Sequence, residues 1–237
     1  MDFVRNRTFR QTLLCHQEVA LKGRLAPERL ADFYLSSSAL PENPSLDPTA
    51  GAAEVFRAPK GRKLTTDHPL TQAAMLHLSQ VWPQAVPFND LYTAARARLN
   101  APDEGRQVQI LGANLLKAFA YHEDLVEFHV YSPPLVRQVS ERPVASPLAR
   151  FQALQKASAV TNLRHESVKI EGLGYHLLPC LDGSWTQSAL VELLTCQLAE
   201  GQIEVQLDDP TIDLEKALPE MVTAALTTLA QAALLTS

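Results

Sequence analysis

Hydrophobic residues recur at helical spacing along most of this chain, and short segments between them alternate between apolar and polar positions. In the middle of the chain, the pattern predicts a hairpin around Pro59–Gly61, helices over residues 68–81, 88–99 and 107–121, and a strand over Leu125–Tyr131. Asp67 is the predicted N-cap of the first of these helices. A hairpin, three helices and a strand, in this order, are typical of a winged-helix domain.

The two flanking parts repeat these patterns less regularly. They contain, in order, a predicted strand over Thr8–Cys15, a helix over Glu28–Leu35, a helix over Leu148–Lys156, strands over Val160–Leu163 and Val168–Ile170, helices over Tyr175–Leu181 and Gln187–Ala199, a strand over Ile203–Leu207 and a helix over Asp213–Leu235. Thr186 is the predicted N-cap of the helix that begins at Gln187, and Gly201 fits the end of that helix. The last helix contains Pro219, which marks either its true start or a kink.

Two proline-rich stretches without periodicity, Pro41–Thr49 and Pro133–Pro147, divide the chain. The expected domains are therefore residues 1–45, 46–140 and 141–237 of the 237-residue chain. Alanine and leucine, with 31 and 37 residues, far outnumber valine and isoleucine, with 16 and 4. This excess of helix formers predicts an α+β fold that is predominantly helical, with tandem winged-helix-like domains and small β-hairpins or wings.

The sequence offers no residues in the patterns that catalysis, cofactor binding or metal binding requires. The close glycine pair Gly172 and Gly174 lacks the third glycine and the preceding strand of a phosphate-binding loop. The pairs His122-Glu123 and His165-Glu166 do not continue into the HExxH motif of zinc enzymes. We therefore assign no catalytic, cofactor-binding or metal-ligating residue, and expect no enzymatic activity.

Charge and apolar length bear on the partners and the location of the chain. The net charge is -5, and the basic cluster Lys60–Lys63 is too small to supply the six to ten phosphate contacts, roughly, of a useful nucleic-acid site. Nucleic acid is therefore not an expected partner. No signal peptide or membrane-spanning stretch is present, and the three cysteines form no CxxC pair, so we expect a cytoplasmic protein that does not bind membranes.

Several stretches together resemble one protein family. They are DFVRNRTFRQTLLCH at residues 2–16, with Val4 where the family has leucine, and residues 25–30, 142–150, 160–166 and 177–183. These stretches resemble the C-terminal region of bacterial class I S-adenosylmethionine (SAM)-dependent methyltransferases that carry a methyltransferase regulatory domain, among them protein-lysine methyltransferases. The apolar helix that ends in Leu181-Asp182-Gly183 also resembles peptide-binding modules of the PqqD type.

The resemblance implies a role for each part of the chain. Residues 1–45 would be the C-terminal remnant of the regulatory domain, residues 46–140 a winged-helix-like domain, and residues 141–237 a second winged-helix or PqqD-like domain. The catalytic domain of the family would precede Asp2, so SAM is implied only for that missing domain and no cofactor is expected on this chain. The expected function is a non-catalytic regulatory or substrate-binding region of a SAM-dependent protein methyltransferase, acting through protein–protein interaction.

Two alternatives stay open: a winged-helix DNA-binding transcription regulator and a PqqD-like peptide-binding module. The partners that the resemblance implies are a methyltransferase catalytic domain, in cis or in trans, or a protein substrate, and a homodimer is also left open. The candidate interaction surface is polar and mostly basic. It comprises Arg5, Arg7, Arg10, Asn162, Arg164 and His165. Arginine suits such a surface because its planar fork pairs with carboxylates through two hydrogen bonds.

Overall fold

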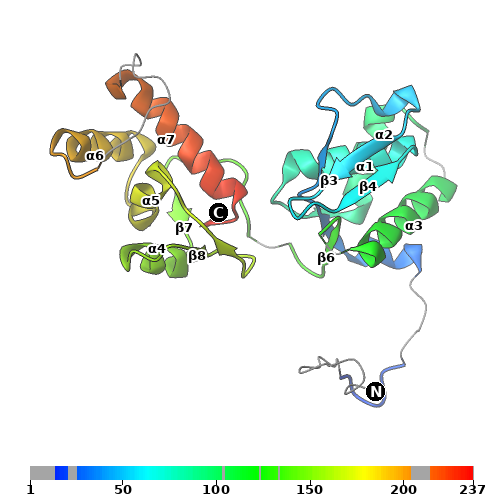
Figure 1. Ribbon diagram of the computed structural model, residues 1–237. Helices are drawn as coiled ribbons and strands as arrows, with labels where there is room; N and C mark the ends of the chain where they lie inside the picture. Colours follow the sequence, from blue (N-terminus) through cyan, green and yellow to red (C-terminus); the bar gives the residue numbers. More distant parts are fainter. Residues whose placement is uncertain are drawn as a thin grey trace, which may run out of the picture.

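The computed structural model describes residues 14–20, 26–102, 105–122, 124–132, 134–203 and 214–236. Its buried hydrophobic residues form two separate clusters, one drawn from residues 30–126 and one from residues 145–235. We call residues 26–132 the N-terminal lobe and residues 134–236 the C-terminal lobe. Figure 1 shows the N-terminal lobe in blue to green and the C-terminal lobe in green to red.

The N-terminal lobe combines three helices with two small antiparallel sheets. Its elements are the 3-10 helices η1 (Pro27–Asp32) and η2 (Pro48–Ala50), strands β1 (Tyr34–Ser36), β2 (Leu40–Pro41), β3 (Glu54–Arg57), β4 (Lys63–Thr66), β5 (Val86–Pro87) and β6 (Glu127–His129), and helices α1 (Pro69–Val81), α2 (Phe88–Leu99) and α3 (Gly105–Tyr121). One sheet has the order β5-β1-β6 and the other β2-β3-β4. The predicted hairpin is the β3–β4 pair, and the predicted strand before Tyr131 contains β6.

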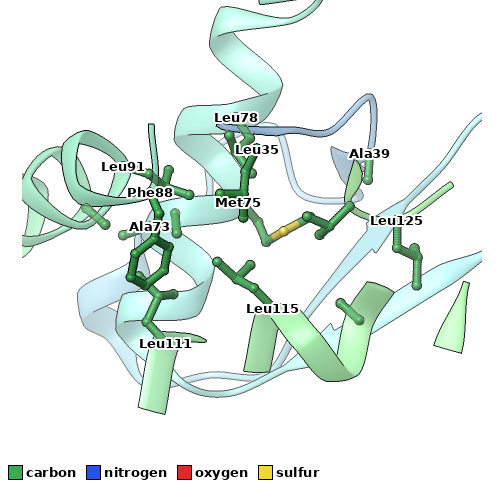
Figure 2. Packing of buried hydrophobic residues seen from close by; sticks show 14 of the residues in the cluster. Leu35, Ala39, Ala73, Met75, Leu78, Phe88, Leu91, Leu111, Leu115 and Leu125 are labelled. Carbon is green, nitrogen blue, oxygen red and sulfur yellow. The ribbon is translucent and has the colours of Figure 1, made fainter. Parts of the chain in front are cut away.

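The core of this lobe lies between the three helices and the strands. Figure 2 shows Met75 and Leu78 of α1 and Leu111 and Leu115 of α3 among the buried side chains of this core, and none of the four is accessible to solvent. Leu35 of β1 is buried in the same cluster. The expected boundary at residue 45 therefore separates segments that pack together, because η1, β1 and β2 contribute to the core and to both sheets of the N-terminal lobe.

Within residues 134–203 and 214–236, the C-terminal lobe has four α-helices and two small two-stranded sheets. Its elements are β7 (Val144–Ala145), α4 (Pro147–Leu154), β8 (Val160–Thr161), β9 (Ser167–Val168), α5 (Leu173–Leu177), the 3-10 helix η3 (Leu178–Cys180), α6 (Gln187–Ala199), α7 (Leu214–Gln231) and β10 (Leu235–Thr236). The two sheets are β10-β7 and β8-β9, both antiparallel. Helix α7 packs on α5 and α6 and supplies the buried side chains of Leu218, Val222, Leu226 and Leu229 to the core.

Several local predictions are confirmed. Helices α2 and α6 have the predicted bounds, and the Thr186 hydroxyl accepts the hydrogen bond of the Ala189 N–H at the start of α6. Gly201 follows the last turn with a φ of 68°. Pro219 lies inside α7, which begins at Leu214, so it does not mark the start of the helix.

Other local predictions are wrong. The N-cap of α1 is His68 and not Asp67, and no side chain caps this helix end, where Pro69 already supplies a first residue that needs no hydrogen bond. Residues 28–35 do not form one helix: η1 ends at Asp32, and Tyr34–Ser36 become a strand because β5 and β6 pair with them on both sides. The predicted strands over residues 8–15 and 203–207 fall almost entirely outside the described residues.

The fold class predicted from composition is confirmed: the molecule is α+β and mostly helical, with small sheets. None of the helices in the described ranges combines the length and the hydropathy needed to cross a lipid bilayer. The N-terminal lobe ends at Ser132 and the C-terminal lobe begins at Pro134. The turn between β8 and β9 also connects the lobes, through the side chain of Arg164. That turn holds three of the residues predicted for the interaction surface.

Candidate functional site

The turn between β8 and β9 is held in shape by Asn162, whose side chain is buried. Its Oδ1 atom accepts hydrogen bonds from the backbone N–H groups of Arg164 and Glu166, both at 2.9 Å. Its Nδ2 atom donates to the carbonyl oxygen of Ala232 at 3.0 Å and to the Glu166 carboxylate at 3.1 Å. The backbone N–H of Leu163 also donates to the carbonyl of Ala233 at 2.9 Å. The turn is thereby attached to the end of α7, and this fixes the direction in which Arg164 leaves it.

Arg164 reaches from this turn to the N-terminal lobe. One guanidinium nitrogen contacts both carboxylate oxygens of Glu127 in β6, and the guanidinium carbon lies 4.4 Å from the centre of the Trp82 ring. Only 10% of the Arg164 side chain is exposed, so the ion pair and the cation–π contact are largely shielded from water. We call Arg164, Glu127 and Trp82 the inter-lobe clasp.

Two residues of the N-terminal lobe hold the Glu127 carboxylate in position. Its Oε2 atom accepts a hydrogen bond from the Ser36 hydroxyl at 3.3 Å and lies 3.3 Å from His129 Nε2. Burial opposes ionisation of the carboxyl group, but the contacts with His129 and Arg164 outweigh it, and the pKa of Glu127 lies below its ordinary value of 4.5. Glu127 is therefore an anion at neutral pH and attracts the Arg164 guanidinium.

The clasp stands beside a cleft between the lobes. One hollow of about 200 Å³ lies beside it and is lined by residues of both lobes, including Lys60, Trp82, Asp124, Glu127 and Glu166. A second hollow of about 310 Å³ adjoins Glu127 and the stacked rings of Phe119 and Phe128, whose centroids are 4.6 Å apart. The two hollows share Lys60, Asp124, Glu127 and Glu166 in their linings. Asp124 is paired with Lys60 and Glu127 with Arg164, so Glu166 is the carboxylate that stays accessible to a cationic side chain.

The structure assigns different surroundings to the residues predicted for the interaction surface. Arg5, Arg7 and Arg10 lie outside the described residues. Asn162 is 5% exposed and supports the turn, Arg164 is bound within the chain, and His165 is exposed with a φ of 60°. Arg164 thus contacts a carboxylate of the same chain, Glu127.

Sequence reasoning missed the N-terminal residues of the clasp. Glu127 lies 37 positions before Arg164, in the alternating strand, and Trp82 ends α1 next to Pro83. A charged residue inside an otherwise apolar alternating segment was the one available signal for Glu127. Nothing in the sequence pattern points from Arg164 to Trp82.

The basic cluster around the β3–β4 turn is compensated by nearby acids. Lys60 Nζ lies 2.9 Å from Asp124, and Lys63 and Arg57 both contact Glu42. Across the described ranges, histidine, cysteine, aspartate and glutamate form no group of three that could hold a metal ion.

Comparison with known proteins finds a family that resembles the C-terminal lobe. Residues 141–234 match the family model described as "PKMT, C-terminal winged helix domain". The C-terminal lobe is therefore similar to that domain. PKMT denotes protein lysine methyltransferase. The inter-lobe clasp therefore joins a lobe that is similar to a PKMT winged helix domain, through Arg164, to the N-terminal lobe.

Two comparisons extend beyond the winged helix domain. The protein RP789 of Rickettsia prowazekii, named as uncharacterized, is 23% identical over 221 residues, which are 90% of this chain and 39% of the relative. The solved structure of PKMT2 from Rickettsia typhi is 20% identical with a TM-score of 0.76, and the match covers 100% of this chain and 48% of PKMT2. A second structure of PKMT2, in complex with AdoHcy, gives the same TM-score over 99% of this chain. Both lobes thus share their fold with PKMT2, and the chain spans less than half the length of these relatives.

The ionisation of the Glu127 carboxyl group predicts that the inter-lobe clasp depends on pH. Because its pKa in the folded protein is lowered, its contribution to lobe contact is present at neutral pH and is lost as the pH falls below 4.5, through the folded pKa. In a W185F variant, Trp82 is the single remaining tryptophan, and its fluorescence reports on Arg164. We expect the emission to change on acidification while circular dichroism still reports the helices.

An E127Q substitution in the same background provides the matched test. It should show at pH 7 the emission that the parent reaches in acid, and it should lose most of the acid transition. An E200Q substitution, at an exposed carboxylate of the C-terminal lobe, should leave the transition unchanged. Identical titrations for the E127Q variant and its parent would contradict the assigned role of Glu127.

Proposed function

We propose that this chain is a non-catalytic region of a SAM-dependent protein methyltransferase, which holds a protein substrate against the catalytic domain. The observation that carries the proposal is the match of the whole chain, in both lobes, to 48% of PKMT2 from Rickettsia typhi, together with the match of residues 141–234 to the PKMT family model. The matching region is the accessory part in this proposal, and the methyl-transfer chemistry belongs to a partner domain in cis or in trans.

The cleft between the lobes supports a substrate-holding role. Of the three carboxylates that line its hollow, Asp124 is paired with Lys60 and Glu127 with Arg164. Glu166 is therefore the anion that a lysine-bearing segment would reach there. Glu166 is the most accessible of the three, with 52% of its side chain exposed. Its Oε2 atom is only 3.5 Å from Arg164 Nε. The binding of a substrate lysine to Glu166 would therefore depend on whether Arg164 stays in the clasp.

The first test uses the purified chain alone. We expect calorimetry to detect no binding of SAM, and tritium-labelled SAM to leave no label on added proteins. Binding of SAM, or transfer of a methyl group by this chain, would contradict the non-catalytic role.

The second test asks whether the chain acts as an accessory region. In PKMT2, the half that matches this chain would be replaced by this chain, and lysine methylation compared with PKMT2 lacking that half. We expect the chimera to methylate protein lysines and the truncated enzyme not to do so. A chimera that folds, by circular dichroism, and still methylates no better than the truncated enzyme would overturn the proposal. Charge reversal at the cleft by E166K should weaken methylation of the substrate, whereas K156E, at an exposed position just after α4, should not.

A further inference from the structure

Strand β9 leaves one edge of its small sheet open. Its residues Ser167 and Val168 pair with β8, and the sheet contains no other strand among the described residues. Burial continues to alternate beyond β9: Val168 and Ile170 are partly buried, and Lys169 and Glu171 are exposed. This period of two is that of a strand, so the edge extends through Glu171 to Gly172, where a φ of 57° turns the chain into α5.

The backbone of this extension has hydrogen-bonding capacity to spare. Among the residues that the structure describes, none forms a backbone hydrogen bond with Lys169, Ile170 or Glu171. Each of these residues carries one donor and one acceptor, which water satisfies in the isolated chain. An open edge of this kind is a template for pairing with another strand.

The edge runs beside an apolar hollow of about 200 Å³. The hollow is lined by Val168, Ile170 and Leu173 on the strand side and by Ala225 and Leu229 of α7. It is smaller than the roughly 300–1,000 Å³ of sites for drug-sized ligands and cofactors, so it suits one or two aliphatic side chains of an adjacent strand.

The charges along the open edge indicate which strand could pair with it. The edge reads Lys169, Ile170, Glu171, and this order is self-complementary when a second copy pairs antiparallel about Ile170. Lys169 of one copy then lies opposite Glu171 of the partner subunit, and the reverse contact forms at the other end. Opposite charges directly across an antiparallel pair stabilise it, and like charges destabilise it. A two-fold axis makes both ion pairs equivalent, as in an isologous dimer.

We propose that the edge formed by residues 168–171 pairs with the same edge of a second copy of this chain. The partner's Ile170 meets Ile170 at the mouth of the apolar hollow, and two Lys169–Glu171 pairs close the ends. The contact involves only a few residues of each copy, so we expect the association to be weak and to depend on concentration. This self-association is independent of the function proposed above.

Sedimentation velocity over a concentration series tests the pairing. The unaltered chain should shift from monomer to dimer with rising concentration, and less so at 0.5 M salt because ions screen exposed pairs. The K169E and E171K variants each place like charges opposite one another, and each should dimerise about tenfold more weakly. Their equimolar mixture should associate again, because only the heterodimer restores both ion pairs.

The control variants separate this pairing from other causes. The doubly exchanged variant K169E/E171K should dimerise like the unaltered chain. The K156E and E192K variants carry the same charge changes at exposed positions, just after α4 and within α6, and should not alter association. A chain that stays monomeric at every concentration would overturn the proposal. The proposal would also be overturned if the K169E and E171K variants dimerised as much as the unaltered chain. The same holds if their equimolar mixture dimerised no more than either variant alone.

Discussion

An R164A variant should separate the two lobes while leaving each lobe folded. The substitution removes the contact with both Glu127 oxygens and the cation–π contact with Trp82, and it leaves the Glu127 carboxylate partly buried without its main cation. A charged hydrogen bond contributes about 1.5–3 kcal/mol, and a cation–π contact about 0.5–2 kcal/mol. Of the remaining contacts between the lobes, the hydrogen bond from Gln84 to the Leu135 carbonyl is long, at 3.4 Å.

Small-angle X-ray scattering should therefore report a larger radius of gyration for the R164A variant than for the parent. Limited proteolysis should cleave the segment near residues 130–134 faster. R164K keeps the charge but loses the planar guanidinium that lies over the Trp82 ring, so it should give an intermediate result. An H165A variant, one residue along the same turn, should behave like the parent because His165 is exposed. Scattering from the R164A variant that superimposes on the parent curve would rule out the clasp as the main inter-lobe contact.

An N162A variant should lower the stability of the C-terminal lobe by about 2–3 kcal/mol. The substitution removes one buried side chain that serves two backbone N–H groups and one carbonyl, and those groups lose their partners inside the folded lobe. It also detaches the turn from the end of α7, so the direction of Arg164 is lost as well.

Urea unfolding followed by the fluorescence of Trp185, in a W82F background, would measure this effect in the lobe concerned. The midpoint should fall for N162A and stay unchanged for N114A, which removes a side-chain hydrogen bond from the other lobe. Scattering should show the same separation of the lobes as in the R164A variant. A midpoint that does not move would show that water replaces the Asn162 hydrogen bonds without cost.

Much of the local structure was predictable from the sequence. The bounds of α2 and α6, the cap at Thr186 and the β3–β4 hairpin follow from spacing and from residues a few positions apart. The prediction of a helix over residues 28–35 failed because Tyr34–Ser36 pair with strands about 50 and 90 positions away, which override the local preference. Strand β10 was predicted as the end of a helix for the same reason: its partner is β7.

The candidate site, too, was only partly predictable from the sequence. The polar block around Asn162 and Arg164 was recognisable as a functional or structural corner because it interrupts apolar segments. The residues that Arg164 contacts were not recognisable, because Glu127 and Trp82 lie 37 and 82 positions from Arg164 and share no periodicity with it. The edge at Lys169–Glu171 has the pattern of a strand in the sequence, but only the pairing of β9 on one side shows that its other side is open.

The sequence by itself determined the helical, α+β character of this chain, its hairpins and its resemblance to methyltransferase C-terminal regions, because these depend on composition and on neighbouring residues. The tertiary structure alone decided that residues 27–41 complete the N-terminal core, that Arg164 joins the lobes and that a cleft of carboxylates and aromatic rings lies between them. These features depend on contacts between distant segments, whose energies come from burial and from charges that meet only when the chain has folded.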